Sequence, residues 1–205
     1  ALADDSPTRI GCSATVEPLE TVADYLVGRE TAGGDARDCE IVDARFVREF
    51  DLRLECPTHD LVATPRDVVQ ERFYDRLDEL VRSHTNTLVF TNSRSGAERV
   101  LQSLRQRFGY DEDDSACHHG SLSKSRRRDV EERLKAGSLD VVTTSTSLEL
   151  GVDMPHVDVV VQVGSPKSVA SLLQRVGRAG HRPGRTVEGR VVALDRDELV
   201  ECAVM

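Results

Sequence analysis

The sequence contains no tryptophan, only three lysines and no C-x-x-C pair among its five cysteines. An odd number of cysteines without ligand spacing argues against a disulfide framework or a zinc site. No apolar run reaches the length of a membrane span, and the N-terminus lacks the charged-then-apolar pattern of a secretion signal. These absences predict a soluble, cytoplasmic protein with neither a bound metal nor a membrane partner.

The charge balance is acidic, and its positive part is almost entirely arginine. Asp and Glu number 36 against 27 Lys and Arg, the net charge is −9, and lysine occurs only at positions 124, 135 and 167. Surface carboxylates help to keep a protein soluble, and with so little lysine they suggest a protein from a high-salt (halophile) cytoplasm; an ordinary acidic protein is the alternative. The acidity argues against indiscriminate binding of polyanions but leaves room for a local basic path to nucleic acid.

Strands and helices alternate regularly from residue 64 onward. Thr87–Thr91 is a continuous apolar run, as in strands covered on both faces of a sheet. We expect Thr64 and Pro65 to cap one helix, and Ser95 with Glu98 to form a capping box on the next. The alternation predicts an α/β fold of three layers, a parallel sheet with helices on both faces. The expected strands are 87–91, 115–119, 140–144, 157–163 and 190–194, and the expected helices are 64–82, 95–108, 123–136 and one through 169–178.

The first part of the chain is less regular. Residues 9–16 and Ile41–Val42 are expected to form short strands, Pro18–Val27 a helix, and Asp51–Cys56 a further strand. This part therefore stands apart from the regular alternation that follows it.

The segment 172–184, L-L-Q-R-V-G-R-A-G-H-R-P-G, carries Arg175 and Arg178 among glycines. Apolar residues recur every three or four positions before it, so we expect a helix with both arginines on one face, at i and i+3. Two planar guanidiniums directed the same way suit a site where several phosphate oxygens gain negative charge. A solvated arginine pair on a surface helix is the alternative, although two glycines, each costing a helix about 1 kcal/mol, suggest close backbone approach.

Small polar residues follow three of the expected strands. Because the carboxyl ends of parallel strands meet at one edge of a sheet, we expect these residues to form one surface. Helix N-termini at such an edge bind anions, and three in a row suit successive phosphates of a nucleic-acid strand. Hydroxyl helix caps without a ligand are the alternative. The residues are Thr91, Asn92, Ser93 and Arg94, then His118, His119, Gly120 and Ser121, then Ser145, Thr146 and Ser147.

Two further features lie beside these strand ends. Lys124 and Arg126–Arg128 form a basic cluster, for which a solvated helix face is the alternative. Aromatic residues for base stacking are absent here, so contacts are expected to be with the nucleic-acid backbone. In L-E-L-G-V-D-M-P, at 148–155, Gly151 allows a close approach of backbone, and Asp153 suits a ribose hydroxyl, an arginine or a helix cap.

Four stretches stand in the order of helicase motifs IV, IVa, V and VI: L-V-F-T-N-S-R, H-H-G-S-L-S, T-S-T-S-L-E-L-G-V-D-M-P and L-L-Q-R-V-G-R-A-G-H-R. Together they resemble the second RecA-like domain of superfamily 2 helicases (P-loop NTPases that include the DEAD/DEAH-box proteins). The sequence around motifs V and VI is similar to that of the large helicase-related (Lhr) family. S-A-T at 13–15 resembles motif III, which closes the first RecA-like domain. The resemblance implies that residues 1–46 are the remnant of that ATP-binding domain with its linker, and 47–205 the second domain.

The resemblance also implies roles for particular residues. Arg175 and Arg178 would be arginine fingers on the γ-phosphate of ATP, with Gln174 alongside, and Gly151 and Asp153 would lie near the ribose. Ser145 stands where the family usually has threonine, which keeps the hydroxyl. The residues implied to hold the phosphates of the tracking strand are Thr91, Asn92, Ser93, Arg94, His119, Gly120, Ser145 and Thr146.

Two motifs of ATP binding, G-x-x-x-x-G-K-[ST] and D-E-x-H, are absent. We therefore expect ATP and Mg²⁺ as cofactors, with Mg²⁺ held mainly by a first RecA-like domain of the same polypeptide, and no activity from this chain alone. The predicted function is that of the C-terminal motor domain of an ATP-dependent 3′–5′ helicase of DNA repair or recombination, which binds single-stranded DNA in preference to RNA. The alternatives are a translocase that does not unwind, an RNA helicase, and a non-catalytic interaction module.

Overall fold

The computed structural model describes residues 8–13, 16–29, 34, 37–43, 49–149, 154–179 and 186–205. It divides the chain into two compact units, Ala1–Val47 and Arg48–Met205. Among the helices of the described residues, none combines the length and apolar composition that a membrane span requires.

The N-terminal unit contains one of the three elements expected within it. Helix α1 (Leu19–Val27) matches the predicted helix; Val27 is its buried residue, whereas Tyr25 is 90% exposed. The strands expected at 9–16 and Ile41–Val42 are wrong for the described residues, because 8–13 and 37–43 have no regular structure. An apolar run becomes a strand only where a neighbouring strand pairs with its backbone, which sequence pattern cannot supply.

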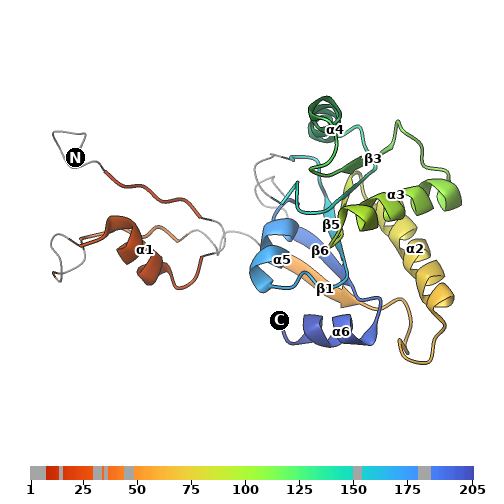
Figure 1. Ribbon diagram of the computed structural model, residues 1–205, viewed down its shortest axis with the longest axis horizontal. Coiled ribbons are helices and arrows are strands. Elements are labelled where there is room, and N and C mark those ends of the chain that lie inside the picture. Colours follow the sequence, from red (N-terminus) through yellow and green to blue (C-terminus); the bar gives the residue numbers. More distant parts are fainter. Residues whose placement is uncertain are drawn as a thin grey trace. The chain divides into compact units, whose positions relative to one another are not determined.

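The C-terminal unit has the predicted alternation of strands and helices. Its elements are β1 (Phe50–Glu55), α2 (Arg66–Ser83), β2 (Thr87–Phe90), α3 (Arg94–Phe108), β3 (Ser115–His118), α4 (Lys124–Ala136), β4 (Val141–Thr144), β5 (Val159–Val163), α5 (Val169–Val176), β6 (Val187–Val192) and α6 (Arg196–Ala203) (Figure 1).

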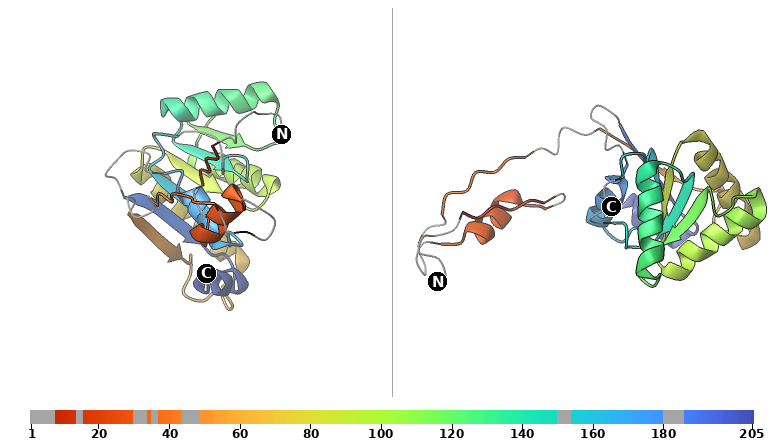
Figure 2. Two further views of the ribbon diagram at one scale, coloured as in Figure 1. Left: turned by 90° about the vertical axis from the view of Figure 1, so that its left-hand side faces the viewer. Right: turned by 90° about the horizontal axis from the view of Figure 1, so that it is seen from above.

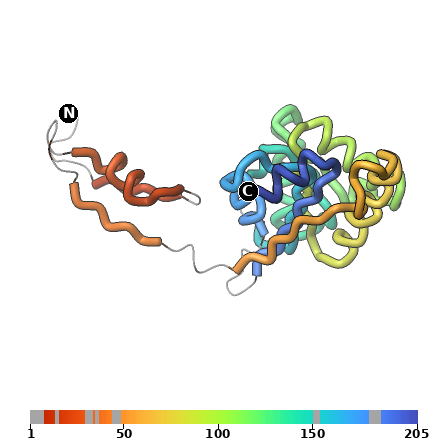
Figure 3. The backbone as a smooth tube through the Cα atoms, turned by 90° about the horizontal axis from the view of Figure 1, so that it is seen from below, coloured from red at the N-terminus to blue at the C-terminus, as the bar shows by residue number. Residues whose placement is uncertain are grey.

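The strands of the described residues form one sheet in the order β1-β6-β5-β2-β4-β3, and each neighbouring pair is parallel. In Figure 3 the orange segment that contains β1 runs beside the blue segment that contains β6, as their register requires. Because no pair is antiparallel, the carboxyl ends of β2, β3, β4 and β5 lie at the same edge. That edge is where the expected surface should lie.

Helices cover both faces of the sheet and bury its alternating side chains. On one face Val89 and Val161 pack with Phe73 and Leu77 of α2 and Leu104 of α3. On the other face the sheet packs against α4 and α5, through Leu88, Phe90, Val142, Val160, Val130, Leu134 and Val176. The right-hand view of Figure 2 shows α4 on one side of the strands and α2 and α3 on the other. The predicted three-layer fold is confirmed.

Several helix ends differ from prediction. The cap of α3 is Ser93, whose Oγ accepts the Gly96 N–H at 3.0 Å, and not Ser95. Glu98 is therefore free of a capping box and bonds to a histidine instead. Thr64 does not cap α2; its hydroxyl donates to the carbonyl of Asp60. Helix α6, capped by Asp195, was not predicted, because it has no buried residue and therefore no apolar stripe.

Candidate nucleotide and nucleic-acid interface

The parallel register brings the three predicted loops to one edge of the sheet. Thr144, at the end of β4, pairs with Phe90 at the end of β2 and with His118 at the end of β3. The amide of Thr91 continues this pairing and donates to the Thr144 carbonyl at 2.9 Å. The loops after β2, β3 and β4 are thus neighbours, as the sequence predicted.

The loop after β2 exposes part of its polar residues. Asn92, Ser93 and Arg94 are exposed, whereas Thr91 is buried and its hydroxyl donates to the Ser93 carbonyl at 2.7 Å. The Ser93 hydroxyl is engaged as the helix cap. The Asn92 amide nitrogen donates to the carbonyl of Ser165, at 2.8 Å, in the loop after β5. The loop is therefore tied to the loop after β5, and Arg94 is its exposed cation.

The loop after β3 is tied to the first loop. Arg94 Nη1 donates to Ser121 Oγ at 2.6 Å, and Gly120 is exposed next to it. His119 is buried, and its Nε2 lies 2.8 Å from Oε1 of Glu98 on α3. The imidazole of His119 thus supports the loop from within, and the exposed residues here are Gly120 and Ser121.

The loop after β4 differs from the expected strand–helix turn. Residues 145–149 are bends and turns, and no helix begins among them. Ser145 is buried and Thr146 exposed, while Ser147 Oγ lies 3.1 Å from the His118 carbonyl, to which it donates. Of this loop's described residues, Thr146 is the exposed hydroxyl.

Two of the helices that begin at this edge, α3 and α4, start with cations. Neither α3 nor α4 has an acidic residue in its first turn, and α4 begins with Lys124, Arg126 and Arg127. Positive charges at a helix N-terminus oppose the helix dipole, at a cost of roughly 0.3–1 kcal/mol each. Helix α6 begins at the same edge, after β6, and has Asp197 and Glu198 in its first turn. The edge is therefore basic at the helices after β2 and β3 and acidic at the helix after β6, and a bound anion would relieve the unfavourable placement at α4.

His118 lies beneath this edge as a buried, neutral group. Burial lowers the pKa of His118, as do the nearby Arg127 and His119, while the bond to Glu131 opposes the shift. Its ring nitrogens lie 2.7 Å from Ser147 Oγ and 3.2 Å from Glu131 Oε1. The imidazole therefore connects the third loop to α4.

The arginine segment departs from the predicted continuous helix. Helix α5 ends at Val176, and Arg178 lies in the turn beyond Gly177. A Cβ at Gly177 would lie 2.8 Å from the carbonyl oxygen of Leu173, which explains the glycine. Arg178 is half-buried, and its Nε donates to the Gln174 carbonyl at 3.3 Å.

Arg175 has a setting that the sequence did not predict. Its side chain is 6% exposed, and its guanidinium contacts four groups of the domain itself. Nη1 donates to Gln162 Oε1 at 2.7 Å and lies 3.5 Å from Asn92 Oδ1, and Nη2 lies 3.4 Å from Glu149 Oε2. The Phe90 ring lies 5.5 Å away. The prediction of two equivalent, outward guanidiniums is therefore corrected: burial and the end of the helix separate Arg175 from Arg178.

Sequence reasoning missed Gln162 and Glu149, which hold Arg175. Gln162 is a fully buried polar residue within the strand V-V-V-Q-V, and a polar residue at a core position was the available signal. Gln174, predicted near the nucleotide, is half-buried on α5. Gly151 and Asp153, predicted near the ribose, lie outside the described residues.

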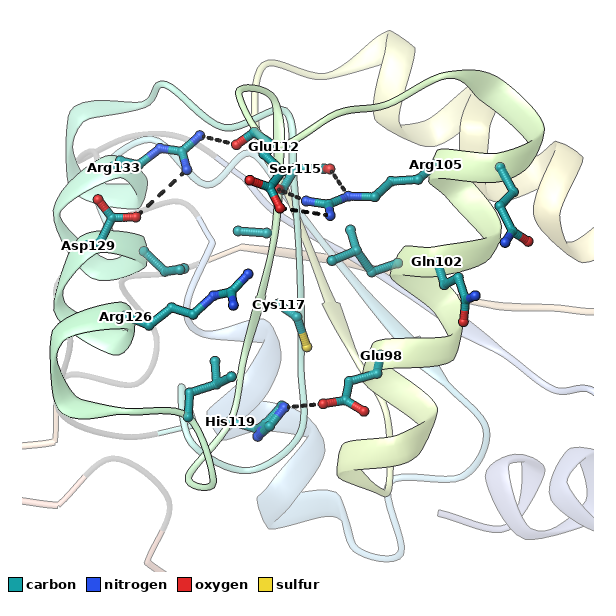
Figure 4. A pocket seen from close by; sticks show the side chains of 15 residues that line it. Glu98, Gln102, Arg105, Glu112, Ser115, Cys117, His119, Arg126, Asp129 and Arg133 are labelled. Atoms are coloured by element: carbon teal, nitrogen blue, oxygen red, sulfur yellow. Dashed lines mark hydrogen bonds and ion pairs between the residues drawn. The ribbon is translucent and has the colours of Figure 1, made fainter.

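A hollow of about 610 Å³ lies away from these arginines, between α3 and α4 over the edge strand β3 (Figure 4). Its charged residues largely pair with one another: Arg133 with Asp129, and Arg105 with Glu112. Arg105 donates to the Ser115 carbonyl and so covers part of the free edge of β3, which protects it from pairing with another strand. Burial raises the pKa of the Cys117 thiol in this hollow, which keeps it protonated.

The six-stranded parallel sheet, with basic loops at its carboxyl edge, is the architecture of the RecA-like C-terminal domain of helicases. The chain belongs to the family described as the helicase conserved C-terminal domain, which matches residues 72–183. It is 48% identical over 200 residues to the ATP-dependent helicase Lhr-Core of Methanothermobacter thermautotrophicus, covering 97% of this chain and 23% of the relative. It is 49% identical over 208 residues to Lhr-Core of Sulfolobus acidocaldarius, covering 100% and 23%.

A solved structure of Lhr from Mycobacterium smegmatis, bound to single-stranded DNA and AMP-PNP, superimposes with a TM-score of 0.78 at 39% identity. The superposition covers 94% of this chain and 25% of that one. The chain therefore spans about a quarter of the length of the proteins it resembles, and it corresponds to their helicase C-terminal domain.

Proposed function

We propose that this chain is the C-terminal motor domain of an ATP-dependent helicase that moves 3′ to 5′ along single-stranded DNA in repair or recombination. Residues 1–46 would complete the first RecA-like domain, and 47–205 would form the second. Alone, the chain would neither hydrolyse ATP nor unwind a duplex. The acidic, lysine-poor composition supports a cytoplasm of high salt as its setting.

The observation that carries this proposal is the position of the cations at the carboxyl edge. Arg94 and Lys124 are exposed there at the starts of α3 and α4, and Arg178 lies in the turn just after α5. A half-buried guanidinium at a turn suits the anionic phosphates of ATP, because Arg offers several donors in one plane. The likeness to Lhr-Core proteins across nearly the whole chain supports the same assignment.

The mechanism gives each group one task. Closure of the two RecA-like domains would bring Arg178 to the γ-phosphate, where it stabilises the negative charge that develops during transfer, with Gln174 alongside. Arg94, Gly120 and Thr146 would hold the phosphates of the strand. Opening and closing of the cleft would then advance the strand, so that hydrolysis depends on domain approach.

Mg²⁺ would supply charge neutralisation between the phosphates of ATP. Within the part of the chain that the structure describes, no three His, Cys, Asp or Glu side chains lie together as a metal site. We assign the Mg²⁺ site to the first RecA-like domain.

The decisive experiment is Arg178→Ala in the full-length protein. We expect kcat for nucleic-acid-stimulated ATP hydrolysis to fall by about 10³-fold or more, with nucleotide affinity largely retained. Arg99→Ala, on the exposed face of α3, is the matched control. Undiminished turnover would favour a non-catalytic interaction module, and equal loss of affinity and turnover would assign Arg178 to ground-state binding.

Two assays separate the remaining alternatives. Strand displacement on a tailed duplex distinguishes a helicase from a translocase that moves without unwinding. Matched single-stranded DNA and RNA, compared as stimulators of hydrolysis, distinguish a DNA helicase from an RNA helicase, because phosphate contacts alone are common to both.

A further inference from the structure

Arg175 joins four parts of the edge through one buried guanidinium. Its partners are Gln162 on β5, Glu149 in the loop after β4, Asn92 in the loop after β2, and the ring of Phe90. The first contact is short, at 2.7 Å, whereas those to Asn92 and Glu149 are 3.5 and 3.4 Å. Hydrogen bonds of N–H to oxygen are normally 2.7–3.2 Å long. The guanidinium is therefore anchored on Gln162 and loosely engaged with the two loops.

The same residue is coupled to Arg178 through the backbone. The Arg178 amide donates to the Arg175 carbonyl at 3.0 Å, and the Ala179 amide donates to the Val176 carbonyl at 3.0 Å. These bonds form the turn that positions Arg178. The backbone carbonyl of Arg175 is therefore part of the turn that holds Arg178.

The other end of the network is the loop that faces the strand. Asn92 stands two residues before Arg94, and its amide group links Arg175 to the carbonyl of Ser165. The Arg175 Nε is buried and, within the described residues, has no hydrogen-bond partner. An unpaired buried donor is costly, and it leaves the guanidinium able to gain an acceptor when a loop shifts.

We propose that Arg175 is a positioning residue, which passes occupancy of the loop after β2 by a nucleic-acid strand to Arg178. Asn92 and Glu149 are its sensing contacts, and Gln162 is its anchor. This inference rests on the proposed function. It assigns to Arg175 the coupling of strand binding to hydrolysis, in place of direct contact with the γ-phosphate.

The test is a double-mutant cycle of Gln162→Met and Arg178→Ala in the full-length protein, measured as kcat for ATP with and without a thymidine homopolymer. Methionine keeps the volume of Gln162 but removes the acceptor. We expect Gln162→Met to reduce the stimulation of kcat about ten-fold, within the usual range of coupling, and to leave KM for ATP within about two-fold. In the Arg178→Ala background it should have no further effect.

Two controls keep the result interpretable. Thr87→Val alters a fully buried strand residue whose hydroxyl has no partner in the described structure, so it should not change stimulation. Glu149→Gln removes the charge but keeps the shape, and it should reproduce the loss if Gln162→Met fails to fold. An equal effect of Gln162→Met in both backgrounds, or no effect in either, would overturn the inference. An unaltered kcat in Arg178→Ala alone would instead overturn the proposed function.

Discussion

Arg175→Ala should destabilise the C-terminal unit by about 2 kcal/mol, and the contacts of Arg175 account for this value. Breaking a buried ion pair by removing one partner typically costs about 3–5 kcal/mol. That range includes the cost of losing the contact with the Phe90 ring and of leaving the Gln162 oxygen without its donor. Against this, the substitution removes the buried Nε that has no partner in the described residues, a gain of about 1–3 kcal/mol. Subtracting the middle of this gain from the middle of that cost leaves a net loss of about 2 kcal/mol.

Urea unfolding of the 205-residue chain, followed by circular dichroism, measures this loss as a change of midpoint at constant slope. Arg178→Ala is the matched control, since it removes the same group three residues later from a half-buried turn, and we expect a loss of about 1 kcal/mol or less. Equal losses in the two variants would refute the distinction between a structural Arg175 and a functional Arg178. A smaller loss for Arg175→Ala than for Arg178→Ala would reverse it.

Two further predictions concern stability. Gly137→Ala should cost more than Gly109→Ala: both glycines are left-handed, at φ +69° and +82°, but a Cβ at Gly137 would lie 2.9 Å from a histidine ring, whereas at Gly109 nothing lies within 4 Å. Gly109→Ala should therefore show only the backbone cost, about 1–2 kcal/mol, in urea unfolding. Burial holds the pKa of His118 in the folded protein below its usual value of about 6.5. Because the unfolded chain binds the proton more readily, the free energy of unfolding should fall as the pH is lowered from 6.5 through the pKa of the folded state. In His118→Gln the urea midpoint should therefore depend less on pH between about pH 7 and 5 than in the unmodified protein. An unchanged dependence of the midpoint on pH would contradict this account.

The fold of residues 64–194 follows closely from the sequence. Continuous apolar strands such as Thr87–Phe90 and helices with clear apolar stripes are strong local signals, and their alternation admits few topologies. The parallel rule then brought the loops after β2, β3 and β4 to one edge, as predicted. Where local signals are weak the predictions failed: among the described residues of its unit Ile41–Val42 has no partner strand, and α6 has no buried face.

The site was less predictable, because side-chain environment depends on distant residues. The spacing of Arg175 and Arg178 suggested equivalent roles, yet Arg175 on α5 donates to Gln162, which lies on strand β5. Similarly, Glu98 matched a capping box by spacing but bonds to His119, 21 residues away. Local pattern identifies which residues are polar, whereas tertiary contacts decide which of them remain available to a ligand.

The cations at the start of α4 repel one another and oppose the dipole of the helix. Mutual repulsion between them falls when counterions gather around them, and a bound polyanion relieves it further. Concentrated salt would accordingly have two opposed effects: it would steady the unoccupied protein while loosening its grip on a strand. Under the proposed function, high salt would therefore favour release of the strand without destabilising the fold of the domain.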